Sequence, residues 1–267
     1  MVTTNTRKVM LIFMPLGVII TSLITVVIAG GIGFPPHRDL RDLGKAFIAN
    51  SYNIWNKTLT SYSLNVVSAI IWDYRGVDTL LETAVLFAAV TGLAAIFRNV
   101  KEMFLGEYRG LSTIVKISAK LIVILTAIAS ISIVVCGHLT PGGGFQGGST
   151  LAAITTLIIV AYSIEAMYRK KITLGKILKL RYSAFAILLL VAITPVAYGL
   201  FSQVKTYYLQ NSVKEDSWFS MPTSFFGTPL GGSIFFFNLV EYIVVASSIA
   251  FIVMLLSMRL RELGLED

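Results

Sequence analysis

Long apolar runs alternate with polar segments along the whole chain. A helix that crosses a lipid bilayer needs about 20 mostly apolar residues. Six runs have this length or come close to it, and they cover residues 9–31, 77–97, 112–136, 148–168, 182–201 and 234–258. The pattern therefore predicts an all-α integral membrane protein with about six transmembrane helices.

Two polar segments, residues 32–60 and 202–233, are too long to be simple turns. The second is rich in Tyr, Trp and Phe, and aromatic residues gather at the headgroup level of a bilayer. A shorter apolar run, SLNVVSAIIWDY at residues 63–74, has too few residues to span a bilayer. We expect this run to lie at the membrane interface or to re-enter the bilayer.

The composition agrees with a membrane protein and excludes an ordinary soluble domain. Hydrophobic residues make up 55% of the 267-residue chain and charged residues 13%, with a mean hydropathy of +0.78. Soluble domains carry about 25% charged residues. The net charge of +8 is better explained by basic loops than by nucleic-acid binding. Cys136 is the one cysteine, which excludes an intrachain disulfide.

The distribution of basic residues predicts the orientation of the chain. With the N-terminus inside the cell, the inner segments hold 13 of the 22 Lys and Arg residues and the outer segments hold 7. Basic loops favour the cytoplasmic side. We therefore expect a multi-pass protein of the cell membrane with both termini in the cytoplasm. The glycine-rich stretch at residues 137–148 then lies at the outer end of the third and fourth helices.

Ionisable residues inside the predicted spans are candidates for function, because a charge at mid-helix costs about 2.5–3.5 kcal/mol on insertion scales. Asp78 and Glu82 lie four residues apart, so they project from one helix face. Such a pair can bind a cation or share a proton. The alternative is that Asp78 caps its helix while Glu82 pairs with a basic residue of another chain.

Three further spans carry charges, and pairing with Arg169 at i+4 accounts for Glu165 in the fourth. Lys116 lies close to the inner end of its helix and can snorkel to the interface, whereas Lys120 lies deeper and is the better candidate for a proton path. Glu241 faces either a polar seam or a partner subunit, and the pattern leaves both open. We assign Asp78, Glu82, Lys120, His138 and Glu241 to a candidate ion pathway.

Nothing in the chain marks a catalytic centre. His37 and His138 are the two histidines and lie in different outer loops, which argues against haem ligation. The sequence has no CxxC, HExxH or P-loop motif. We expect no catalytic role and no bound metal or cofactor in this chain.

The stretch GHLTPGGGFQGG interrupts the apolar helices with a proline and six glycines. Each glycine penalises a helix by about 1 kcal/mol, and glycines let backbones approach closely. The stretch predicts a tight turn between the third and fourth helices that packs against neighbouring helices or lines a polar cavity. A plain helix-hairpin turn is the alternative. The structural residues of the glycine-rich stretch are Gly137, Pro141, Gly142, Gly143, Gly144, Gly147 and Gly148.

GHLTPGGGFQGG resembles the signature of the MrpB (MnhB) family of multisubunit Na+/H+ antiporters, and the resemblance covers roughly residues 108–260. GTPLGG and NLVEYIVVASSIAFIVML look like the late part of that family. Residues 65–98 resemble instead the C-terminal region of the large antiporter subunit MrpA, where the usual wording is close to VDFRGFDTLGE. The matching positions are Asp73, Arg75, Gly76, Asp78, Thr79, Leu80 and Glu82, and the departures are Tyr74, Val77 and Leu81.

The two resemblances imply a fusion of an MrpA-like region with two transmembrane helices, residues 1–107, and an MrpB-like region with four, residues 108–267. Similar proteins occur in archaeal membrane-bound respiratory complexes related to complex I. The resemblance implies a subunit of an Mrp-type antiporter module that works with other antiporter subunits and a hydrogenase-like redox arm driven by ferredoxin. The fused arrangement favours the sulfane sulfur reductase type.

Other readings remain open. The chain could belong to a hydrogenase-type complex or to a stand-alone Mrp antiporter. It could also be a purely structural connector in which the acidic pair holds helices together, or an independent small carrier. In the ion-translocation reading, Asp78 and Glu82 bind or relay cations, while Lys120 and the motif around His138 border the path.

Overall fold

The computed structural model describes residues 4–29, 40–98 and 110–258, which fold mainly as helices. The chain divides into two compact units, residues 1–46 and 47–267. The first unit contains α1 (Thr4–Ile28) and the beginning of α2 (Asp42–Ser51). Within α1, the described apolar stretch Gly17–Ile28 is shorter than a membrane span. The predicted count of six spans is therefore not confirmed in the part of the chain that is described.

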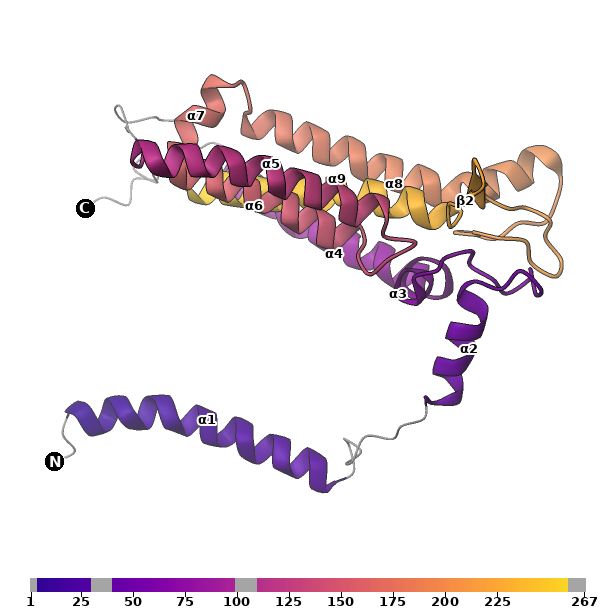
Figure 1. Ribbon diagram of the computed structural model, residues 1–267, viewed down its shortest axis with the longest axis horizontal. Coiled ribbons are helices and arrows are strands. Elements are labelled where there is room, and N and C mark those ends of the chain that lie inside the picture. The colour runs from indigo at the N-terminus through magenta and orange to yellow at the C-terminus, as the bar shows by residue number, and fades with distance from the viewer. Residues whose placement is uncertain (1–3, 30–39, 99–109, 259–267) are drawn as a thin grey trace. The chain divides into compact units, whose positions relative to one another are not determined.

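Five helices of the second unit are long and apolar enough to cross a bilayer, and Figure 1 shows them running side by side. They are α4 (Gly76–Ile96), α5 (Thr113–Val135), α6 (Gly144–Tyr162), α8 (Leu174–Ser202) and α9 (Ser233–Leu256). Five of the six predicted spans correspond to these helices, which confirms a multi-pass membrane protein of the all-α class.

Helix α9 forms the core of the bundle, because it packs against α4, α5, α6 and α8. Its sequence is apolar on most sides, as expected for a helix that is largely enclosed by others. Near its start, Phe237 stacks on Trp72 with ring centres 4.6 Å apart. Near its end, Phe251 and Met254 pack in a second apolar cluster with Val90 of α4.

Short elements close the two ends of the bundle. The run at residues 63–74 forms α3 (Val66–Ala69) and the π-helix η1 (Ile70–Tyr74), consistent with a segment too short to span. The long segment before α9 contains a two-stranded hairpin, β1 (Ser224–Phe225) and β2 (Thr228–Pro229). The remaining short element is α7 (Ile164–Arg169).

Two predicted span boundaries differ from the structure. The fourth span was expected at residues 148–168, but Ser163, with a φ of +95°, separates α6 from α7. The fifth was expected to begin at Tyr182, but α8 begins at Leu174, where Thr173 accepts a hydrogen bond from the backbone N–H of Lys176. This earlier start places Arg181 inside the helix.

The glycine-rich stretch is only partly a turn. Residues 136–143 connect α5 to α6, and Gly142 has a φ of +145° that side chains other than glycine rarely adopt. Gly144 and Gly147, expected before a span that begins at Gly148, instead lie with Gly148 in the first turns of α6. Tight packing of α6 against two other helices outweighs the low helix propensity of glycine at these positions.

Candidate intramembrane carboxylate site

Glycines of α6 form its close contact with α9. A Cβ atom on Gly144 would lie 2.5 Å from the backbone oxygen of Asn238 and 2.5 Å from Oε2 of Glu241. A Cβ atom on Gly148 would lie 2.8 Å from the backbone oxygen of Tyr242. Any side chain at either position would push the helices apart, so the glycines bring the start of α6 directly onto α9.

Side chains of α9 cap the N-terminus of α6. The N-cap residue of α6 is Gly143, which has no side chain to accept the free N–H groups of the first turn. The side-chain oxygen of Asn238 accepts the N–H of Gly144 at 3.3 Å, and the carboxyl of Glu241 accepts the N–H of Phe145. The positive end of a helix dipole favours a carboxylate at this place.

Glu241 also lies within electrostatic range of Glu82 on α4. Glu82 stands six residues into α4, about 9 Å from the start of the helix, and its side chain is exposed on the bundle. Glu241 is 4% exposed. A carboxyl near a second one shares a proton or a cation with it more readily than the two carry separate charges, most of all where one of them is buried. We call these two residues the carboxylate pair.

Asp78 is engaged elsewhere. Its carboxylate accepts a hydrogen bond of 2.7 Å from Nε of Arg75 and forms an ion pair with the same guanidinium. The structure thus places Asp78 and Glu82 on one face of α4, as the spacing indicates, but gives each carboxylate a different neighbour. No side-chain cap by Asp78 is found within the described residues of this turn.

Lys120 and His138 do not join the carboxylate pair. Lys120 is exposed on α5, seven residues from Thr113 and therefore in the half of the bundle opposite to the pair. His138 lies in the turn before α6, where Nε2 donates to the backbone oxygen of Pro229 at 2.9 Å. Burial lowers the pKa of His138 below its usual 6.5, so the imidazole is neutral and connects two outer segments. His37 lies outside the described residues.

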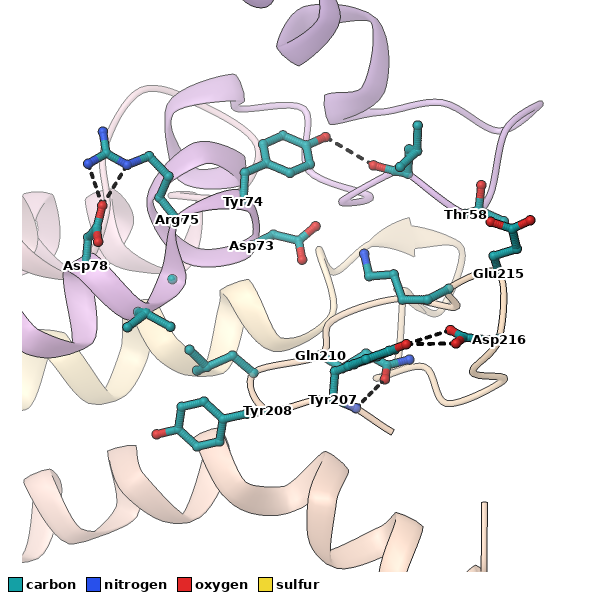
Figure 2. Close-up of a pocket in the computed structure, with 15 residues that line it drawn as sticks. Thr58, Asp73, Tyr74, Arg75, Asp78, Tyr207, Tyr208, Gln210, Glu215 and Asp216 are labelled. Carbon is teal, nitrogen blue, oxygen red and sulfur yellow. Dashed lines mark hydrogen bonds and ion pairs between the residues drawn. The ribbon is translucent and has the colours of Figure 1, made fainter. Parts of the chain in front are cut away.

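A polar pocket of about 660 Å³ opens at the start of α4 (Figure 2). Its wall includes Asp73, Arg75 and Asp78 on one side and Tyr207 and Asp216 on the other. The hydroxyl of Tyr207 donates to the carboxylate of Asp216 at 2.8 Å, and Lys205 pairs with the same carboxylate. Glu82 stands one helical turn below Asp78, so the pocket lies directly above the carboxylate pair along α4.

Asp73 is the least exposed acid of this pocket. Its carboxylate accepts a hydrogen bond of 2.7 Å from the hydroxyl of Ser61. Burial raises the pKa of Asp73, while the charge of Lys214 and hydrogen bonds from Ser61 and Asn211 oppose that shift. The pocket therefore contains an acid that takes up a proton more readily than an exposed aspartate does.

Sequence reasoning missed Asn238 and Arg181. Asn238 is fully buried in the structure. In the sequence it is a single polar residue within an apolar run, and the sequence does not indicate its hydrogen-bond partners. In the sequence, Arg181 directly precedes the predicted span at residues 182–201, yet it is fully buried between α4 and α8. The N-cap signal of Thr173 could have shown that the helix begins before Arg181.

The described residues contain no group of three or more His, Cys, Asp or Glu side chains that could hold a metal ion. The arrangement instead offers single carboxyls, two ion pairs at the pocket and two acids within electrostatic range of each other. Such groups exchange protons or bind monovalent cations.

Residues 114–251 match the family of domains related to the MnhB subunit of Na+/H+ antiporters. An uncharacterized protein of Methanocaldococcus jannaschii, MJ1307, is 36% identical over 125 residues, covering 39% of this chain and 47% of that protein. The match thus spans about half the length of this curated relative.

Two solved membrane complexes contain chains of similar fold. One is the membrane-bound sulfane sulfur reductase, an archaeal respiratory membrane complex, with a TM-score of 0.65 and 23% identity over 93% of this chain and 99% of that chain. The other is the Mrp complex from Dietzia sp. DQ12-45-1b, with a TM-score of 0.62 and 18% identity over 96% of this chain and 26% of that chain.

Proposed function

Because the chain belongs to the family of domains related to the MnhB subunit of Na+/H+ antiporters, we propose that it is a membrane subunit of an Mrp-type Na+/H+ antiporter module within a ferredoxin-dependent respiratory complex. Its task in the module is ion translocation, and it performs no catalysis itself. Its partners are other antiporter subunits and a hydrogenase-like redox arm, and it carries no cofactor.

The carboxylate pair carries this proposal. Ionisable groups inside spans are costly and are kept where they serve transport. Glu82 and Glu241 lie close enough to interact, and one of them is exposed on the bundle where a neighbouring subunit can reach it. A cation or proton enters at the pocket beside Asp73 and Asp78 and reaches Glu82 one turn deeper.

The division of the chain into two regions is part of the proposal. Residues 1–107 correspond to the MrpA-like region and residues 108–267 to the MnhB-like region. The family match at residues 114–251 falls within the second region. In the Mrp complex, about a quarter of one chain aligns with 96% of this chain. This alignment supports the proposal that the two regions together form one part of an antiporter.

The complex is of the sulfane sulfur reductase type in this proposal. The coverage of 99% of a chain in the archaeal sulfane sulfur reductase supports this choice, because the two chains align almost end to end. Neighbouring genes test the choice: a hydrogenase-like large subunit that lacks intact nickel-ligating cysteines favours sulfur chemistry. Intact cysteines would favour a hydrogenase.

We place the protein in the cell membrane with both termini in the cytoplasm, although the terminal residues lie outside the described part of the chain. Lys170 and Lys171 are exposed at the end of α7, opposite the glycine-rich turn. Basic residues favour the cytoplasmic side. The carboxylate pair and the pocket then lie in the outer half of the membrane.

Substitution of Glu82 by Gln in the purified complex tests ion translocation. Gln keeps the size of the side chain and removes its charge, so we expect ferredoxin-driven Na+ uptake into proteoliposomes to be abolished while the complex stays assembled. Lys179→Gln is the control, because it removes an exposed charge near the start of α8, away from the pair. Unchanged uptake in Glu82→Gln would contradict the proposal.

A structural role is the second candidate, because the carboxyl of Glu241 caps α6. Glu241→Gln separates the two roles, since the amide oxygen of Gln still accepts the N–H of Phe145. If the role is only structural, Glu241→Gln keeps both assembly on a native gel and Na+ uptake, whereas Glu241→Ala loses the assembled complex. If the pair carries ions, Glu241→Gln assembles but transports poorly.

A further inference from the structure

Arg181 of α8 is a fully buried charge within the bundle. Its Nη2 donates to the hydroxyl of Thr91 at 2.9 Å and to the backbone oxygen of Phe87, both on α4. The guanidinium carbon lies 4.3 Å from the centre of the Phe87 ring and 5.3 Å from that of Tyr182. Arg181 therefore binds α4 to α8 through neutral groups.

The charge of Arg181 is not neutralised by a neighbouring acid. Ion pairs within the described ranges join Lys45 to Asp42, Arg75 to Asp78 and Lys205 to Asp216, and Arg181 takes part in none of them. Its remaining neighbours are neutral: Tyr182 lies within side-chain hydrogen-bond range of the guanidinium, and the buried Nε and Nη1 have no acidic partner in the described residues. A buried, unpaired cation is costly in a membrane span, so its presence calls for a reason beyond packing.

The position of Arg181 suggests that reason. Phe87, whose backbone oxygen it binds, stands five residues beyond Glu82 on α4, about 7.5 Å further toward the inner end. An apolar cluster that includes Val90, Ile177 and Met254 fills the interior around Arg181 and further inward, and a second one that includes Ala184 and Leu188 fills it on the outer side. Arg181 thus lies inward of the carboxylate pair as a single charge between two apolar clusters.

We propose that Arg181 is a fixed electrostatic barrier that stops cations at the carboxylate pair from passing inward through the bundle. A positive charge held in a low-dielectric interior repels cations and protons, as it does in selective pores. An ion that reaches Glu82 then leaves sideways, through the exposed face of α4, into a neighbouring subunit. The inference rests on the proposed ion-translocating function.

Passive cation flux through the purified complex tests the barrier. The complex is reconstituted in proteoliposomes without ferredoxin, and proton and 22Na+ fluxes are followed under an imposed gradient. Arg181→Gln removes the charge but keeps an amide that can donate to Phe87 and Thr91. We expect passive flux to rise by at least about threefold, because removing a like charge lowers an electrostatic barrier. Arg181→Lys keeps the charge and should leave the flux near that of the wild type.

The variants also distinguish a barrier from a purely structural clamp. If Arg181 only holds α4 to α8, Gln and Lys lower the melting temperature of the complex alike and neither raises flux in assembled complex, which would overturn the proposal. If both variants raise flux equally, packing and not charge is the cause, and the proposal is also overturned.

A double variant separates this inference from the proposed function. If the extra flux passes the carboxylate pair, Arg181→Gln combined with Glu82→Gln should return flux to the wild-type level. Unchanged flux in Arg181→Gln, together with lost driven uptake in Glu82→Gln, refutes the barrier and leaves the function standing. Normal driven uptake in Glu82→Gln refutes the function itself.

Discussion

The indole Nε1 of Trp72 donates a hydrogen bond of 3.0 Å to the side-chain oxygen of Asn238, the same oxygen that accepts the N–H of Gly144. One amide thereby joins η1, α9 and the beginning of α6 in a region closed to solvent. Trp72 and Asn238 are both fully buried. The start of α6 is held in place by this contact together with Glu241.

Substitution of Asn238 by Ala should therefore destabilise the protein. The N–H groups of Trp72 and Gly144 would lose their acceptor, and each buried unsatisfied donor costs about 1–3 kcal/mol. Thermal unfolding in detergent measures the loss. Ser183→Ala is a suitable control, because its hydroxyl lies on the exposed surface of α8. Equal melting temperatures for both variants would contradict the assigned contact.

Substitution of Gly148 by Ala should separate α6 from α9. The added Cβ would meet the backbone oxygen of Tyr242 at 2.8 Å and Cβ of Val245 at 2.9 Å. Overpacking of this kind costs about 1–3 kcal/mol. Gly92→Ala on α4 is the matched control, since its Cβ would meet nothing within 4 Å. We expect Gly148→Ala to melt at a lower temperature and Gly92→Ala to melt at the same or a higher one.

Protonation of His138 should lower stability in mild acid. Its folded-state pKa lies below the usual 6.5, because burial disfavours the charged imidazole. As the pH falls below 6.5, the unfolded chain gains this proton first, so the free energy of unfolding decreases toward the folded-state pKa. The imidazole packs against Phe235 and Gly231 and bonds to Pro229, none of which titrates.

Melting curves of the wild type and of His138→Gln, recorded between about pH 8 and about pH 5.5, measure this effect. The wild type should lose more stability over this interval than the variant, because the variant lacks the titrating ring. Parallel losses in the two proteins would show that other groups cause the acid sensitivity.

The spanning helices of the second unit could be predicted from apolar runs alone, because length and hydropathy are local properties of a sequence. The start of α6 could not, and the start of α8 required the N-cap signal of Thr173 in addition. Gly144 is helical only because α9 supplies acceptors for the first N–H groups of α6, and Arg181 is buried only because α4 covers it. Both effects depend on contacts between segments far apart in the chain.

The candidate site was predictable to a similar degree. The spacing of Asp78 and Glu82 places them on one face of a helix, and the structure has them so. The spacing alone could not indicate that Arg75 pairs with Asp78, or that Glu82 lies near Glu241 of α9. The role of these residues in ion movement stays a prediction until the variants of Glu82 and Glu241 are measured.

The close packing of Gly144 against Glu241 affects how an ion can reach the carboxyl of Glu241. The start of α6 covers one side of this carboxyl, and Glu82 on α4 lies within electrostatic range of it. In the proposed function an ion therefore reaches Glu241 from the side of α4 and leaves by the same side. Exchange of the ion between the two acids, and not passage beyond Glu241, would then set how long the ion stays.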